Sequence, residues 1–140
     1  MRKRKLSGEE RGHLIERIAA ILKTKEYILF AYIFGSFASE DSFKDIDVGI
    51  FISGKKLESP LKLELDMEGE LEDTTHIPVD VRIINNTPLS FIYNILKNRI
   101  VIVDNNKSMR ADFEGLVYKK YFDFQYLRRE YLKEIINAPV

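Results

Sequence analysis

The chain has 140 residues, of which 45% are hydrophobic and 31% charged, and both the length and the composition are typical of one globular domain. Its 22 Lys and Arg residues balance its 22 Asp and Glu residues. A large non-specific nucleic-acid surface needs a basic excess, so this balance argues against one. The lack of cysteine excludes disulfides, thiolate zinc sites and cysteine nucleophiles. We therefore expect a single domain over residues 1–140.

No apolar run in the sequence approaches the ~18 residues that a membrane span requires. The first five residues, Met-Arg-Lys-Arg-Lys, are basic, but no long apolar stretch follows them as it would in a secretory signal. We therefore expect no membrane association and a cytoplasmic protein.

The hydrophobic pattern predicts helices alternating with strands. Residues 8–24 show helical spacing of apolar side chains, and Ser7 followed by Glu9 and Glu10 is typical of a helix start. The apolar run over 27–34 predicts a buried strand. The later elements predicted are a short helix or loop over 37–44, a strand over 45–52, a turn over 53–56, a helix over 60–72, a strand over 78–84, a turn over 85–88, a helix over 88–97, a strand over 99–103 and a helix over 107–136. This order predicts an α/β or α+β domain with one mixed sheet of about four strands, flanked by helices.

Asp45 and Asp47 open the apolar strand predicted over 45–52. Strand alternation places side chains at i and i+2 on one sheet face, so the two carboxylates lie side by side and repel each other. Magnesium prefers carboxylate and phosphate oxygens, and it would relieve this repulsion. The alternative to a metal-binding pair is an ordinary strand start at which both carboxylates are exposed to solvent.

Two further features strengthen the metal interpretation. Gly35-Ser36 directly follows the first buried strand, where a glycine lets a phosphate approach the backbone and a following helix would aim its N–H groups at it. Asp80 lies between two valines in a later strand, where an unpaired charge is costly, although an ion pair with Arg82 would also explain it. Three carboxylates and a Gly-Ser turn together predict a two-metal site for phosphoryl transfer.

These residues resemble the DNA polymerase β-like nucleotidyltransferase superfamily, whose signature is a Gly-Ser turn, then Asp-x-Asp, then a third acidic residue on a later strand. More narrowly, the chain resembles the minimal nucleotidyltransferase (MNT) antitoxins that act on HEPN-domain toxins. The aromatic tail over 111–131 looks like the helical tail of those antitoxins. The chain differs from the common pattern in Ser39-Glu40 after the turn, in a shorter spacer and in Lys44 before the first aspartate.

The resemblance implies a role for each site residue. Asp45, Asp47 and Asp80 would be the catalytic, metal-binding carboxylates, holding two Mg²⁺ ions that Mn²⁺ can replace. Gly35 and Ser36 would contact the triphosphate of ATP. The resemblance also implies that AMP is transferred from ATP to a tyrosine of a HEPN toxin. That toxin would be the protein partner.

Lys44 and Arg82 flank the expected site and could neutralise phosphate charge, although a plain surface role is at least as consistent with their positions. The acidic run over 64–73 is typical of a solvated helix face or of a surface for a basic partner. The aromatic tail predicts a helix packed on the sheet, and its outer side leaves a homo- or hetero-oligomer open. Two other functions remain open: nucleotidyl transfer to a small molecule or an RNA end, and a non-catalytic module that neutralises a toxin by covering it.

Overall fold

The computed structural model describes residues 3–54 and 59–137. Its elements in chain order are β1 (Arg4–Lys5), α1 (Gly8–Lys23), β2 (Ile28–Phe34), α2 (Ser36–Ser39), β3 (Ser42–Phe43), β4 (Ile46–Ile52), α3 (Pro60–Thr75), β5 (Val79–Ile83), α4 (Leu89–Lys97), β6 (Ile100–Asp104) and α5 (Lys107–Asn137). The longer helices and the strands of the main sheet begin and end within three residues of their predicted bounds. The turn predicted over 53–56 lies partly outside the described residues. None of the helices described is both long and apolar enough to cross a membrane.

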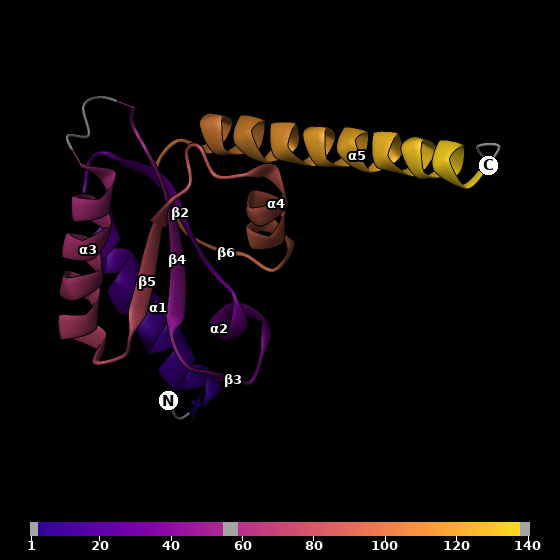
Figure 1. Ribbon diagram of the computed structural model, residues 1–140. Helices are drawn as coiled ribbons and strands as arrows, with labels where there is room; N and C mark the ends of the chain where they lie inside the picture. Colours follow the sequence, from indigo (N-terminus) through magenta and orange to yellow (C-terminus); the bar gives the residue numbers. More distant parts are fainter. Residues whose placement is uncertain (1–2, 55–58, 138–140) are drawn as a thin grey trace.

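Four strands form a mixed sheet in the order β5-β4-β2-β6. β2 pairs antiparallel with both β4 and β6, whereas β4 and β5 run parallel. A parallel pair needs a crossover connection, and α3 supplies it on one face of the sheet (Figure 1). The predicted α/β fold with a mixed four-stranded sheet is thereby confirmed.

Helices cover the two faces of this sheet unequally. α1 and α3 lie against one face, where Ile46, Val48 and Ile50 of β4 are buried (Figure 1). α4 and the start of α5 cover part of the other face, where Phe30 and Tyr32 of β2 are buried. Side chains alternate along a strand, so the odd-numbered positions of β4 lie on this second, partly covered face.

The first helix begins as its sequence predicts. The Ser7 hydroxyl accepts a hydrogen bond from the Glu10 backbone N–H at 3.1 Å, and the Glu10 carboxylate accepts one from the Ser7 N–H at 3.1 Å. This reciprocal pair satisfies two backbone donors that a helix start otherwise leaves without partners.

A second, two-stranded sheet was not predicted. β1 pairs antiparallel with β3, so that Arg4 lies opposite Phe43 and Lys5 opposite Ser42. Strands of two residues show no alternation from which a sequence could reveal them. This pairing places the basic N-terminal segment beside the loop that leads into Asp45.

The last helix has two unlike halves. Its first half contributes Glu114 and Val117 to the interior, whereas its second half extends beyond the sheet and the other helices (Figure 1). No side chain between Phe122 and Asn137 is buried. The long C-terminal helix is therefore confirmed, but only half of it packs on the sheet.

Candidate functional site

Asp47 and Asp80 lie side by side on the partly covered sheet face. They are register partners in the parallel pair β4–β5, and Asp47 is also opposite Phe34, the last residue of β2. The Gly35 turn follows Phe34 directly. Three neighbouring strands thus bring Asp80, Asp47 and Gly35 into one row across the sheet, as the sequence led us to expect for the two aspartates.

Asp45 lies one residue before β4 rather than on it. The strand begins at Ile46, whose backbone N–H donates to the Pro78 carbonyl at 2.9 Å. The prediction of a strand from residue 45 was therefore wrong by one position, because the first pairing with the β5 segment forms at Ile46. Asp45 is still close enough to Asp47 for its charge to raise the pKa of Asp47.

Burial, together with the charges of Asp45 and Asp80, raises the pKa of Asp47 from its ordinary value of 3.8 to about 6, and burial is the largest of these causes. Arg82 acts in the opposite direction, more weakly. Like charges therefore gather around one half-buried carboxylate, and this arrangement costs stability until a cation is bound.

The Gly35 turn packs directly against the Asp47 carboxylate. Gly35 has φ of +74°, which side-chain-bearing residues rarely adopt, and a Cβ atom there would overlap Asp47 Oδ2. Only glycine therefore allows this turn to reach the carboxylate. Ser36 begins α2, which is only four residues long. A single turn carries a small dipole, so the dipole contribution expected for phosphate binding is correspondingly small.

An arginine holds this turn from the other side of the sheet. The Arg11 guanidinium donates to the Phe37 carbonyl and lies 4.4 Å from the centre of the Phe37 ring. The Phe37 and Phe43 rings pack edge to face at 4.8 Å. These contacts fix the segment between Gly35 and Asp45 to α1, which the sequence pattern did not reveal.

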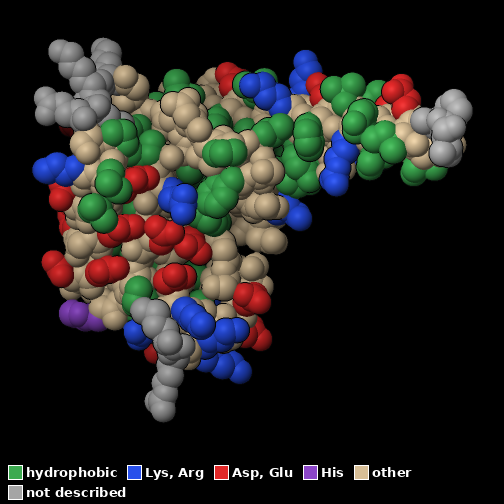
Figure 2. Space-filling view, in the orientation of Figure 1, with side chains coloured by type: hydrophobic (Ala, Val, Ile, Leu, Met, Phe, Trp, Pro, Cys, Tyr) green, Lys and Arg blue, Asp and Glu red, His purple; other side chains and the backbone are tan. Residues whose placement is uncertain are grey.

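Arg82 faces the site, and it also forms the ion pair considered from the sequence. Its Nε atom lies 3.8 Å from Asp80 Oδ2, with both side chains about half exposed. The guanidinium lies 5.1 Å from the centre of the Phe91 ring on α4. Lys44 is exposed between β3 and β4, and Lys and Arg side chains gather at the β3 end of this face (Figure 2). Both cations therefore lie at the margins of the carboxylate row.

Three glutamates of α3 bind the backbone of β5, contrary to the expectation of a solvated acidic face. The bonds run from the N–H groups of Val79, Val81 and Ile83 to Glu72 at 3.0 Å, Glu68 at 2.8 Å and Glu64 at 2.9 Å, respectively. Four helical residues rise about 6 Å and two strand residues about 6.6 Å, so the two spacings match. The i, i+4 repeat of glutamate was the signal that could have revealed this contact. These three bonds satisfy backbone N–H donors of the edge strand β5.

Glu68 also extends the group of acids around the site. Burial raises the pKa of Glu68, and its hydrogen bond with Asp80 and the Asp80 charge act in the same direction, whereas its bond from Val81 lowers it. Acidic side chains accordingly gather over α3, β5 and β4 on this face (Figure 2).

The donor set fits magnesium. In the described parts of the chain, no three His, Cys, Asp or Glu side chains are arranged so that they could hold a metal ion by themselves. Magnesium usually takes only one or two carboxylates from the protein and completes its shell with substrate phosphates and water. Asp45 and Asp47, beside the Gly35 turn, offer two carboxylates of this kind.

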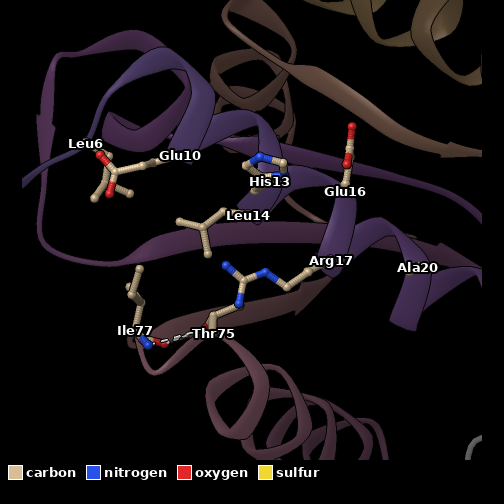
Figure 3. Close-up of a pocket in the computed structure, with 9 residues that line it drawn as sticks. All are labelled: Leu6, Glu10, His13, Leu14, Glu16, Arg17, Ala20, Thr75 and Ile77. Carbon is tan, nitrogen blue, oxygen red and sulfur yellow. Dashed lines mark hydrogen bonds between the residues drawn. The ribbon is translucent and has the colours of Figure 1, made fainter.

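A cavity of about 600 Å³ lies elsewhere, where α1 meets the turn between α3 and β5. The Arg17 guanidinium points into it, towards Leu14 and Thr75 (Figure 3). None of Asp45, Asp47, Asp80 and Glu68 lines it, so this cavity is separate from the candidate site.

Comparisons with known proteins bear on the family and the fold of the chain. The family model described as "Polymerase beta, Nucleotidyltransferase" matches residues 16–108, a range that contains every candidate site residue from Gly35 to Arg82. No curated protein matches the chain significantly.

Solved structures share the fold at low sequence identity. One is the tri-AMPylated HEPN toxin of Shewanella oneidensis in complex with its MNT antitoxin, with 12% identity, a TM-score of 0.68, and 90% of this chain and 98% of that chain covered. Another is the toxin–antitoxin MntA-HepT, with 12% identity, a TM-score of 0.66, and 89% and 98% covered. A third is a toxin–antitoxin with AMP-PNP, with 12% identity, a TM-score of 0.67, and 88% and 98% covered. Together with the family model, which spans most of the chain, they lead to one conclusion: the chain belongs to the polymerase β nucleotidyltransferase family.

Proposed function

We propose that this protein is a magnesium-dependent antitoxin that transfers AMP from ATP to a tyrosine hydroxyl of a HEPN-domain toxin. The observation that carries the proposal is the row of Asp80, Asp47 and Gly35 across three neighbouring strands. Structures of the same fold include an AMPylated HEPN toxin with an MNT antitoxin and a complex with AMP-PNP, and these support AMP as the transferred group.

In the proposed reaction, the acceptor oxygen attacks the α-phosphorus of ATP. A new P–O bond forms, the bond from the α-phosphorus to the bridging oxygen breaks, and pyrophosphate leaves with that electron pair. The hydroxyl proton passes to Asp80 or to water. Bound Mg²⁺ would offset the negative charge that develops on the triphosphate.

Each site residue has a part in this reaction. Asp45 and Asp47 hold the metal, and Gly35 and Ser36 let the phosphates approach the backbone. Asp80 lies one strand further towards the sheet edge, where the acceptor hydroxyl arrives. Arg82 and Lys44 neutralise phosphate charge from the margins, and Arg82 must leave its 3.8 Å pair with Asp80 to do so.

The free half of α5 provides the surface for the toxin. Its exposed apolar side chains are Phe122, Phe124, Tyr126, Leu127, Tyr131, Leu132, Ile135 and Ile136. Exposed apolar side chains in this number favour a protein-interaction surface, and they lie on a part of α5 that the body of the domain does not cover (Figure 1).

The proposal is tested by incubating the protein with α-³²P-labelled ATP, Mg²⁺ and a HEPN-domain toxin from the same organism. We expect label on the toxin, and a toxin with its acceptor Tyr replaced by Phe should bind normally but remain unlabelled. Label on an RNA end or a small molecule instead would contradict the antitoxin role and leave the family intact. Toxin neutralised without any labelling would support the binding module.

A further inference from the structure

A groove of about 360 Å³ runs beside the candidate site, between α3 and the edge strand β5. One wall is a single stripe of α3 at positions i, i+3, i+4 and i+7, and the other is a short stretch of β5. The lining residues are Leu61, Glu64, Leu65, Glu68, Asp80, Val81 and Arg82. The groove therefore contains the third site carboxylate, although neither of the other two aspartates lines it.

Two leucines on the α3 wall have no role in the core. Leu61 is 64% exposed and Leu65 is 56% exposed, while Met67 on the same helix is only 2% exposed and packs into the interior. Leucines spaced i, i+4 lie next to each other on a helix surface. They form an apolar strip along the groove that is available to a partner.

The charge of the groove is acidic. Glu64, Glu68 and Asp80 line it, against the single cation Arg82, which already lies 3.8 Å from Asp80. An acidic groove with an apolar strip is complementary to a segment that combines apolar and basic side chains.

The position of the groove also suits an attacking group. Gly35 and the end of β2 lie on one side of Asp47, and β5 lies on the other. A triphosphate at the Gly35 turn would leave the β5 side open. A nucleophile arriving along β5 then approaches from the side opposite to the leaving pyrophosphate, as in-line displacement requires.

We propose that this α3–β5 groove receives the acceptor segment of the partner protein, with its hydroxyl at Asp80, an apolar side chain on Leu61 and Leu65, and a Lys or Arg near Glu64. The inference rests on the proposed function and adds the chemistry of the acceptor to it.

The first experiment uses synthetic peptides that carry one Tyr. Their flanks are apolar and basic, apolar and acidic, or basic alone, and a Phe replaces Tyr in a control peptide. With Mg²⁺ and labelled ATP, we expect kcat/KM for the apolar basic peptide to exceed that of either other Tyr peptide by about tenfold. Equal labelling of the three Tyr peptides would overturn the proposal.

The second experiment changes the groove and uses the whole HEPN partner as substrate. Leu61→Ser with Leu65→Ser should raise KM for the partner about tenfold without changing kcat, whereas Met109→Ser, at a side chain 39% exposed on α5, should change neither. Glu64→Gln keeps an oxygen for the Ile83 N–H and removes the charge, so it should reduce the preference for basic peptides a few-fold.

The outcomes separate this inference from the proposed function. If the leucine variants label the partner as well as wild type does, the groove is not the acceptor site, while the enzyme assignment stands. If wild type labels neither peptides nor partner, the proposed function fails and the inference fails with it. Calorimetry with Mg²⁺ and ATP should give the same affinity for wild type and the leucine variants.

Discussion

The carboxylate of Glu114 and those of the site aspartates differ in the partners that surround them. Glu114 on α5 is 8% exposed and accepts hydrogen bonds from the Tyr32 hydroxyl at 2.6 Å, from Arg99 at 2.8 and 2.9 Å, and from Arg110 at 3.2 Å. Among the described residues, the one cation paired with a site aspartate is Arg82, at 3.8 Å from Asp80, and the charged neighbours of Asp47 are otherwise acids.

The consequences appear in the pKa values. The paired cation Arg110 also lowers the pKa of Asp104, so the charges around Glu114 are mutually satisfied. At the site, burial and neighbouring acids raise the pKa of Asp47 to about 6. The fold supplies cationic partners to the charge that stabilises it. In the proposed function Asp47 is kept for a metal-bound ligand, and without that ligand the repulsion from its acidic neighbours lowers stability.

The largest expected effect is on catalysis at the group without partners. Asp45→Asn with Asp47→Asn keeps side-chain size but removes the charges that bind the metal, and we expect AMP transfer to fall by about 10³-fold or more. Label transfer measures the rate, and Asp73→Asn, an exposed acid on α3, is the control. Full activity of the double variant would contradict the metal-site assignment.

Substitution of Glu114, which has its partners within the fold, should lower stability instead of catalysis. Glu114→Ala leaves Arg99 and Arg110 without their shared carboxylate, and we expect the free energy of unfolding to drop by about 3 kcal/mol in urea titrations. Glu134→Ala, at an exposed position on the same helix, should change it by less than about 0.5 kcal/mol. If Glu114→Ala lowers the free energy of unfolding by less than about 1 kcal/mol, the network contributes less to stability than its hydrogen bonds indicate.

The smallest effect is a dependence of stability on pH between about 4 and 6, which arises at the site. Because the folded-state pKa of Asp47 is raised from 3.8 to about 6, the metal-free folded protein binds more protons than the unfolded chain between these values. Its stability should therefore fall as pH rises from about 4 to about 6. The shift corresponds to ~3 kcal/mol at most, and partial exposure of the carboxylate reduces this to about 1–2 kcal/mol.

Asp47→Asn isolates that contribution. The variant should be more stable than wild type by about 1–2 kcal/mol at pH 7 without metal, and the difference should vanish near pH 4. Urea titrations at several pH values measure it. A variant less stable than wild type at pH 7 would show that Asp47 has a stabilising partner in the fold.

The contrast also explains what the sequence could predict. Asp47 and Asp80 were predictable because each is a charge inside an apolar strand, and strand alternation fixes the face on which it lies. Glu114 was not, because its partner Tyr32 is 82 positions away and nothing in a helical pattern indicates a distant hydroxyl. A tyrosine in an otherwise apolar strand was a hint, since a buried hydroxyl needs a partner.

Other contacts that the sequence did not predict also depend on tertiary structure. The glutamates of α3 reach β5 only because the crossover places helix and edge strand side by side, and the pairing of Arg4 with Phe43 depends on where the chain returns. The position of Asp45 just outside its strand was a boundary error of one residue. Local pattern gives the elements and the buried charges, but partners that depend on tertiary contacts must come from the structure.

The most direct test of the central claim, that the site carboxylates are kept for a metal-bound triphosphate, is calorimetric titration with ATP in Mg²⁺ and in EDTA. We expect clear binding with Mg²⁺ and little or none in EDTA, because carboxylates around Asp47 repel a triphosphate whose charge is not neutralised. The Asp45→Asn, Asp47→Asn variant should lose the metal dependence. Equal affinity of wild type for ATP in Mg²⁺ and in EDTA would show that these carboxylates do not bind a metal with the triphosphate.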